Sequence, residues 1–158
     1  MKITTTETTV VQQHELPAAI RATSPITDYA DAFTLVASDA GCWTPEQWAR
    51  ALFEDVAALM GQFVWRVLLG LRLRWRRSVT SVAGWRIAER GDGWIRLEAR
   101  GWMLTGHLVV HIETDRVTLA TFIRYDRRIA ARVWTTLSRV HRDEASGLLR
   151  DALKTLRA

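Results

Sequence analysis

The stretch WMLTGHLVVHIETDRVTLATFIRY, residues 102–125, contains two runs rich in apolar and β-branched residues, joined by the turn-forming segment ETDRV. Such runs favour strands, and a short polar connection between them favours a hairpin. We therefore predict a hairpin with strands over 102–113 and 117–125. Because side chains alternate between the two faces of a strand, one face of the first strand is expected to meet the core with Trp102, Leu104, Leu108, Val110 and Ile112.

Strand-like segments also precede this hairpin. Residues 28–36 end in apolar and β-branched residues, and the segments 85–90 and 94–100 are separated by turn residues. In LRLRWRR (71–77), leucine and tryptophan share one face while arginine occupies the other, which is the period of a half-buried strand. The sequence thus predicts one early strand and, after a helical region, five strands in a meander.

The segment WTPEQWARALFEDVAALMGQFVWRVLLG predicts the helical region between these strands. Thr44 is expected to be the N-cap, with Pro45 at the first helical position and Gln47 closing a capping box. Gly61 is expected to interrupt the run, because glycine is a poor helix former. A second short helix is then predicted over 62–69.

The last part of the chain, 127–156, predicts a long amphipathic helix with Asp126 as its N-cap. Gly147, near its middle, weakens the helix by about 1 kcal/mol relative to alanine. The apolar residues that recur at helical spacing, and are expected to face the sheet, are Ile129, Val133, Leu137, Val140, Leu148 and Ala152.

The order of these elements predicts an α+β fold. An antiparallel sheet with one apolar face must cover that face, and the long last helix is the available cover. We expect a curved antiparallel sheet of about six strands around the C-terminal helix, with two short helices after the first strand. This single domain would span 26–158, with an extended arm over 1–25. A cavity between such a sheet and its helix would suit an apolar ligand.

Composition limits the classes of protein that fit. A chain of 158 residues with 48% hydrophobic and 25% charged residues is typical of one globular domain. The single cysteine, Cys42, excludes an internal disulfide and a multi-cysteine metal cluster. The first 17 residues lack the apolar core of a secretory signal, and the longest apolar stretch contains Arg66 and is too short to span a membrane. We expect a cytoplasmic protein without a cofactor.

Positive charge is concentrated in one part of the chain. The net charge is +5, and no acidic residue occurs between Asp55 and Glu89. A patch of this kind attracts nucleic acid or an anionic membrane, although a solvated sheet face is the commoner meaning. Peripheral membrane contact and a homodimer are left open. The basic residues in this interval are Arg66, Arg72, Arg74, Arg76, Arg77 and Arg86.

Two of the four histidines, His107 and His111, are four residues apart in a predicted strand. At about 3.3 Å per residue they would lie roughly 13 Å apart, too far to bind one metal ion together. We therefore predict no metal site. Their side chains alternate away from the predicted core face, so we expect them to be exposed or at an interface.

A few polar residues fall on the face of the predicted cavity. Thr121 and Tyr125 interrupt the apolar face of 117–125, and His141 borders the stripe of the last helix. Tyr125 and His141 are the candidates for proton transfer, although a satisfied hydroxyl or imidazole is the simpler interpretation. The predicted ligand-binding residues are Tyr29, Phe33, Leu108, Val110, Thr121, Tyr125, Leu137 and His141.

Short motifs in a particular order extend over nearly the whole chain, 14–157. They are HELP (14–17), DYADAF (28–33), WARALFE (48–54), GLRL (70–73), HL (107–108), TFIRY (121–125), and RVW with VHR in the last helix. This order resembles a bacterial family of unknown function within or near the START-like superfamily, which includes lipid-transfer proteins and polyketide cyclases. The start of the last helix, RRIAARVW, departs from the family pattern, which often has an asparagine and a glycine before the arginine.

The resemblance implies the helix-grip fold and a pocket for a hydrophobic ligand, but no single reaction. The favoured function is binding of a lipid-like or polyketide-like small molecule. A cyclase or isomerase using Tyr125 or His141 is the alternative, so enzymatic activity is left open. A module that binds nucleic acid or anionic membrane through the Arg66–Arg86 patch is less favoured, and nucleic acid is the least favoured partner.

Overall fold

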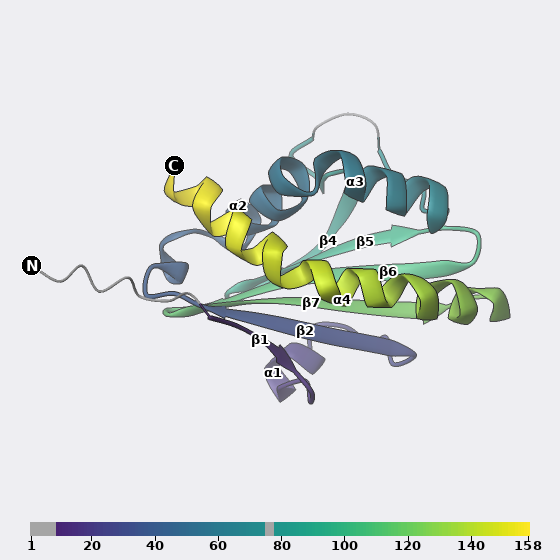
Figure 1. Ribbon diagram of the computed structural model, residues 1–158, viewed down its shortest axis with the longest axis horizontal. Coiled ribbons are helices and arrows are strands. Elements are labelled where there is room, and N and C mark those ends of the chain that lie inside the picture. Colours follow the sequence, from purple (N-terminus) through teal and green to yellow (C-terminus); the bar gives the residue numbers. More distant parts are fainter. Residues whose placement is uncertain (1–8, 75–77) are drawn as a thin grey trace, which may run out of the picture.

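A computed structural model describes residues 9–74 and 78–158, and for 58–60 the backbone alone. Within these residues, seven antiparallel strands form one open sheet in the order β1-β2-β7-β6-β5-β4-β3 (Figure 1). The strands are β1 (Thr9–Gln13), β2 (Tyr29–Val36), β3 (Ser81–Val82), β4 (Trp85–Gly91), β5 (Trp94–Arg100), β6 (Leu104–Glu113) and β7 (Arg116–Tyr125).

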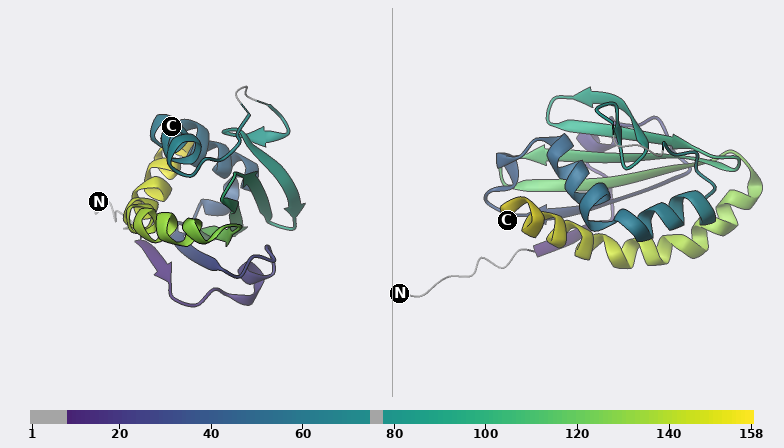
Figure 2. Two further views of the ribbon diagram at one scale, coloured as in Figure 1. Left: turned by 90° about the vertical axis from the view of Figure 1, so that its right-hand side faces the viewer. Right: turned by 90° about the horizontal axis from the view of Figure 1, so that it is seen from above.

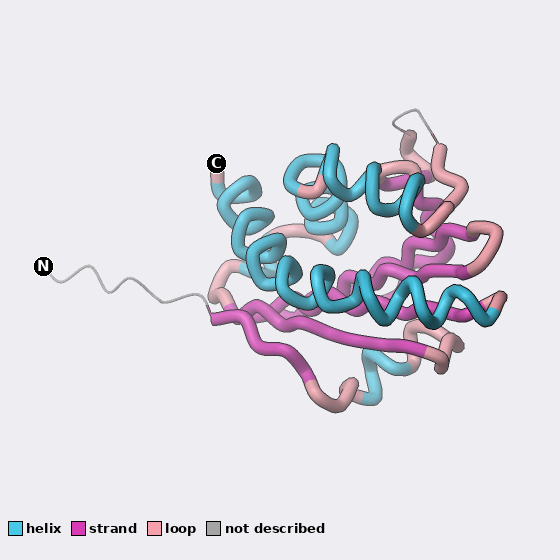
Figure 3. Tube along the Cα trace, turned by 45° about the vertical axis from the view of Figure 1, so that its right-hand side comes forward, coloured by secondary structure: helices cyan, strands magenta, loops and turns pink. Residues whose placement is uncertain are grey.

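Helices lie on both faces of this sheet, and the sheet curves around the larger group (Figure 2). We call the face covered by α2 to η3 and by α4 the inner face, and the opposite face, beside α1, the outer face (Figures 1 and 3). The helical elements are α1 (Ala18–Arg21), the 3-10 turn η1 (Ala40–Cys42), α2 (Pro45–Arg50), the π-helix η2 (Ala51–Val56), α3 (Ala58–Phe63), the π-helix η3 (Val64–Leu68) and α4 (Arg128–Arg157).

The structure confirms the predicted α+β class and the central hairpin. β6 and β7 pair from Leu104↔Tyr125 to Glu113↔Arg116, so the two strands are in register over their full length. The predicted core face of β6 is confirmed for its central residues, but Trp102 was assigned wrongly. Trp102 lies in the turn before β6, where alternation no longer holds, and its side chain is 54% exposed.

The two edges of the sheet differ from the prediction. β1 and β3 were not predicted, since one lies in the polar N-terminal segment and the other has only two residues. The segment 71–74 is not part of a named strand; it forms an isolated bridge between Leu71 and Gly101. Its alternation is nevertheless confirmed, because both leucines are buried and both arginines are exposed. The predicted positions of Trp75 and Arg76 lie outside the described residues.

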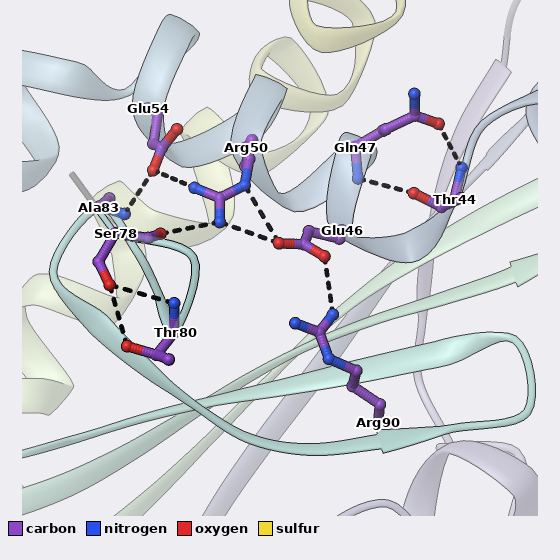
Figure 4. A network of polar contacts seen from close by, with 9 residues as sticks. All are labelled: Thr44, Glu46, Gln47, Arg50, Glu54, Ser78, Thr80, Ala83 and Arg90. Carbon is purple, nitrogen blue, oxygen red and sulfur yellow. Dashed lines mark hydrogen bonds and ion pairs between the residues drawn. The ribbon is translucent and has the colours of Figure 1, made fainter.

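The predicted start of the first long helix is confirmed. The Gln47 amide donates to Thr44 Oγ1 at 3.1 Å, and the Thr44 amide donates to Gln47 Oε1 at 2.8 Å (Figure 4). The predicted interruption at Gly61 is wrong, because the helix breaks at Ala57 instead. Gly61 lies inside α3, where a Cβ atom would approach the Trp65 ring to 2.9 Å. The glycine makes room for an indole rather than ending a helix.

The last helix begins and turns differently from the prediction. Arg127 is the N-cap, while the Asp126 carboxylate accepts hydrogen bonds from Thr105 Oγ1 at 2.7 Å and Arg124 Nε at 2.8 Å. The predicted stripe is confirmed for Ala152, which is buried, and is wrong for Ile129 and Val140, which are exposed. Most of the buried residues lie one position further along the helix, a rotation of roughly 100°. The buried residues are Ala130, Trp134, Ser138, Ala145, Leu149, Ala152 and Leu153.

A polar network joins α2 and η2 to the β3–β4 edge of the sheet (Figure 4). The Arg50 guanidinium contacts the carboxylates of Glu46 and Glu54 at 2.9 and 2.8 Å, and donates to the Ser78 carbonyl at 3.0 Å. The other oxygen of Glu46 accepts from Arg90 on β4 at 2.7 Å. These contacts hold the helical layer over the sheet.

The outer face carries a second, smaller core. The segment predicted to be an extended arm contains β1 and α1, and Ile20 and Ile26 pack against the sheet residues Ala32, Val109, Ala120 and Phe122. His107 lies on this face, as its alternation predicts, but it is buried rather than exposed. Its Nδ1 is 2.8 Å from Ser24 Oγ and its Nε2 is 3.3 Å from Glu98. Burial is the main reason that the pKa of His107 is lowered to about 4.

Candidate functional site

The inner face is almost entirely apolar except for one row near its centre. Each row consists of register partners on neighbouring strands. The polar row contains Leu97, Leu108, Thr121 and Asp31. The rows on either side are Ala99, Gly106, Ile123 and Tyr29, and Ile95, Val110, Leu119 and Phe33. A carboxylate and a hydroxyl therefore lie side by side within an apolar surface, where each needs a polar partner.

Asp31 is the centre of this site. Its side chain is 5% exposed, and its Oδ2 accepts a hydrogen bond from the Tyr29 hydroxyl at 2.6 Å. His141 Nε2 approaches both carboxylate oxygens, at 3.3 Å from Oδ1 and 3.2 Å from Oδ2. Burial, followed by the charge of Asp31, raises the pKa of Tyr29, while the nearby Arg142 guanidinium opposes the shift. Tyr29 is thus a protonated donor at neutral pH.

Aromatic rings surround the Asp31 carboxylate. The Trp134 ring of α4 is 5.3 Å from the Tyr29 ring and 5.5 Å from the His141 ring, measured between centroids. The Phe33 ring lies edge-on to His141 at 6.4 Å. Two residues of β2 and two residues of α4 therefore form an aromatic enclosure around one buried charge. The His141 side chain retains 20% exposure, so this imidazole lies at the boundary between the enclosure and solvent.

Two buried donors of the same region have no hydrogen-bond partner within the described part of the chain. They are Thr121 Oγ1 and Trp134 Nε1. Thr121 is the register partner of Asp31, and the Trp134 ring contacts Tyr29 and His141, so both atoms belong to this site. A buried polar atom without a partner costs about 1–3 kcal/mol. Thr121 Oγ1 and Trp134 Nε1 could therefore each donate to an acceptor atom of a bound molecule.

A second aromatic group lies on the other side of the inner face. The ring of Trp65 is 6.0 Å from Phe53 and 5.5 Å from Trp85. The Trp85 indole packs against Gly106 of β6, where a Cβ atom would lie 3.0 Å from the ring. Trp85 Nε1 is also buried without a partner among the described residues. Aromatic side chains therefore flank β6 and β7 from both sides.

The structure brings together four of the predicted ligand-binding residues, namely Tyr29, Phe33, Thr121 and His141. Leu108 and Val110 are buried in the same inner face, and Leu137 is half-buried on α4. Tyr125 lies at the end of β7, where its register partner is Leu104. Burial and the charge of Asp28 raise the pKa of its hydroxyl. Tyr125 is thus two rows away from Asp31.

Sequence reasoning missed the two residues that define the site, Asp31 and Trp134. A signal existed for Asp31, because a charged residue between Tyr29 and Phe33 shares their face in an alternating strand. Trp134 was missed because the predicted apolar stripe of α4 ran through Val133 and Leu137, which placed Trp134 outside the face expected to meet the sheet. Arg142 was missed because its proximity to Tyr29 depends on where α4 crosses β2.

No protein-family model, curated protein or solved structure matches the chain. Within residues 9–74 and 78–158, no helix is long and apolar enough to cross a membrane. In the same residues, no group of three or more histidine, cysteine, aspartate or glutamate side chains could hold a metal ion. Function must therefore be inferred from the Asp31 site itself.

Proposed function

We propose that the protein binds an amphipathic small molecule between the inner face of the sheet and α4. The observation that carries the proposal is the pair of buried, unpartnered donors, Thr121 Oγ1 and Trp134 Nε1, beside the buried Asp31 carboxylate. Apolar rows on either side would hold the body of the ligand. The polar row would hold its oxygen-bearing group.

The chemistry of the site limits the ligand class. Both unpartnered groups can donate a hydrogen bond, so the ligand should present a carbonyl, ether or hydroxyl oxygen. A hydroxyl could in addition donate to the Asp31 carboxylate. A free carboxylate is disfavoured next to Asp31, because two like charges in a buried site repel strongly. A neutral, oxygenated, lipid-like or polyketide-like molecule fits these conditions.

The fold supports this proposal. A long C-terminal helix lying across a curved antiparallel sheet is the arrangement expected of the helix-grip fold, which the sequence motifs resemble. We include membership of the START-like superfamily in the proposal. The ligand would lie along β6 and β7, between the Asp31 group and the aromatic group of Phe53, Trp65 and Trp85.

Native mass spectrometry of the purified protein tests the proposal directly, with solvent extraction to identify any retained molecule. Titration with a dansyl-labelled fatty alcohol measures binding by energy transfer from tryptophan. The variant Thr121→Val removes one donor and keeps the shape of the side chain, whereas Trp134→Phe removes the other donor together with part of the ring. Both should bind about 5- to 30-fold more weakly, the loss expected for one hydrogen bond. A protein that retains no molecule and binds no neutral amphiphile would overturn the proposal.

A second candidate function is catalysis of a cyclisation or isomerisation by proton transfer. The observation that favours it is the contact between His141 Nε2 and Asp31, because a carboxylate at hydrogen-bond distance can orient an imidazole for proton transfer. His141 is the better of the two predicted proton-transfer residues, since it touches the site and Tyr125 does not. Once a substrate is known, turnover that is lost in His141→Gln and kept in Tyr125→Phe would support this role. Full turnover in His141→Gln would exclude it.

A further inference from the structure

The outer face has a pocket of about 350 Å³ at the edge formed by β4, β5 and the segment 71–74. We propose that this basic pocket binds a phosphate group. It is separate from the Asp31 site, which lies on the inner face, and it does not depend on the function proposed above. Its lining residues are Arg72, Arg74, Gly84, Arg86, Glu98, Ala99 and Arg100.

The backbone holds the pocket in shape. The Arg72 amide donates to the Arg100 carbonyl at 2.9 Å, and the Arg74 amide donates to the Gly84 carbonyl at 3.2 Å. Gly84 has φ +90°, and a Cβ atom there would lie 2.6 Å from the Arg74 carbonyl oxygen. The side chains of Arg72 and Arg74 are exposed and line the pocket, because the alternating Leu71 and Leu73 are buried in the core. The basic groups are therefore positioned by the fold.

The charges lining this pocket do not balance. Four guanidiniums face one carboxylate, Glu98, which contacts Arg86 at 3.3 Å and Arg100 at 3.1 Å. Glu98 also contacts His107, whose pKa of about 4 leaves it neutral at pH 7. Among the residues that the structure describes, the Arg74 guanidinium donates only to the Thr80 hydroxyl, at 3.2 Å. Within the described residues, the Arg72 guanidinium has no hydrogen bond or ion pair.

Arginines outside the pocket provide the contrast. Arg90, on the same strand as Arg86, pairs with Glu46 at 2.7 Å (Figure 4), and Arg157 pairs with Asp39 at 2.8 Å. Guanidinium groups bind phosphate through pairs of parallel hydrogen bonds, which makes phosphate the natural partner for a concave arginine cluster. Glu98 contacts one nitrogen of each neighbouring guanidinium, Nη2 of Arg86 and Nε of Arg100.

An apolar surface lies next to the pocket. Trp102, two residues after Arg100, is 54% exposed, and its indole lies against Gly70. Val67 and Leu68, just before Gly70, are 63% and 40% exposed. A phosphate could therefore come from a soluble phosphorylated molecule or from a lipid headgroup whose chains contact this surface. The chemistry in the pocket is the same in both cases.

Two probes distinguish these sources: inorganic pyrophosphate in solution, and phosphatidylcholine vesicles with or without phosphatidic acid. The variant Arg72→Gln/Arg74→Gln removes two pocket charges. The matched control, Arg132→Gln/Arg139→Gln, removes two charges from exposed positions on α4. We expect the pocket variant to bind at least about tenfold more weakly than the native protein and the control to bind normally. Unchanged thermal melting verifies that both variants fold.

Either source of phosphate supports the proposal. Pyrophosphate binding identifies a soluble ligand, whereas binding only to vesicles containing phosphatidic acid identifies a headgroup. Three outcomes overturn it: no binding of either probe, equal weakening in the two double variants, or a marked preference for single-stranded nucleic acid over both probes. Equal weakening would mean that net charge, rather than the pocket, attracts the anion.

Discussion

Thr121→Val should stabilise the ligand-free protein while weakening ligand binding. Thr121 is 2% exposed, and its Oγ1 has no partner within the described residues. Replacing the hydroxyl by a methyl group removes a desolvated polar atom, which costs about 1–3 kcal/mol, and keeps the volume of the side chain. Allowing for imperfect packing of the new methyl, we expect a gain of about 1 kcal/mol in the free energy of unfolding. For a chain of this length that raises Tm by about 2–4 °C.

A buried threonine on the opposite face of the same strand is the matched control. Thr118 is 7% exposed, and its Oγ1 is 2.8 Å from Thr34 Oγ1. Thr118→Val breaks this hydrogen bond, so we expect a loss of up to about 1 kcal/mol. Because Thr118 faces outward, its replacement should leave binding of the dansyl-labelled alcohol unchanged.

Stability is measured by urea unfolding, followed by circular dichroism. The protein is first freed of bound molecules by unfolding it over a hydrophobic resin and refolding it. Binding is measured by the titration with the dansyl-labelled fatty alcohol. The two variants should change stability in opposite directions, and only Thr121→Val should weaken binding. A loss of more than about 1 kcal/mol on Thr121→Val would refute the reasoning, since it would mean that the native fold satisfies this hydroxyl. Unaltered binding by Thr121→Val would remove it from the ligand site.

Three further predictions concern the fold. Because the pKa of His107 is lowered to about 4, the unfolded chain binds the additional proton between pH 6.5 and 4. The contribution of His107 to the free energy of unfolding is therefore fully present above pH 6.5 and is lost as the pH decreases to 4, by at most about 3 kcal/mol. The free energy of urea unfolding, measured against pH, should vary less for His107→Gln than for the native protein. The same pH dependence in both proteins would contradict the assignment. Gly147→Ala should stabilise α4 by about 1 kcal/mol, because nothing lies within 4 Å of the added Cβ; a fall in Tm would contradict this. Gly61→Ala should instead lower Tm despite the better helix propensity of alanine, because its Cβ would meet the Trp65 ring at 2.9 Å; an increase equal to that of Gly147→Ala would show that the indole moves freely.

Local signals were sufficient for much of the fold. Period-two alternation located β2 and β4 to β7, because a half-buried strand must place its apolar side chains on one face. The capping box at Thr44 and Gln47 located the start of α2, because both of its hydrogen bonds join residues only three apart. Alternation in 71–74 also assigned Arg72 and Arg74 to the face away from the core.

Contacts between distant segments decided the rest. The rotation of α4 was set by its packing against η2, α2 and the strands β1, β2 and β7, which buries Trp134 and Leu149 and leaves Ile129 and Val140 exposed. His107 is buried because a segment some 80 residues earlier in the chain covers it, which no local pattern reports.

Both proposed sites have the same origin. The sequence contains a basic stretch, Arg66–Arg86, and a charged residue, Asp31, on the inward-facing side of a predicted strand. Only the tertiary structure joined Asp31 to His141, 110 residues later. Only the pairing of β4 with β5, and of Leu71 with Gly101, gathered arginines from three segments around Glu98. Within the strands, the sequence by itself determined which side chains face inward or outward, because that depends on local periodicity. Which of them meet depends on strand order and helix rotation, which are set by packing across the whole chain.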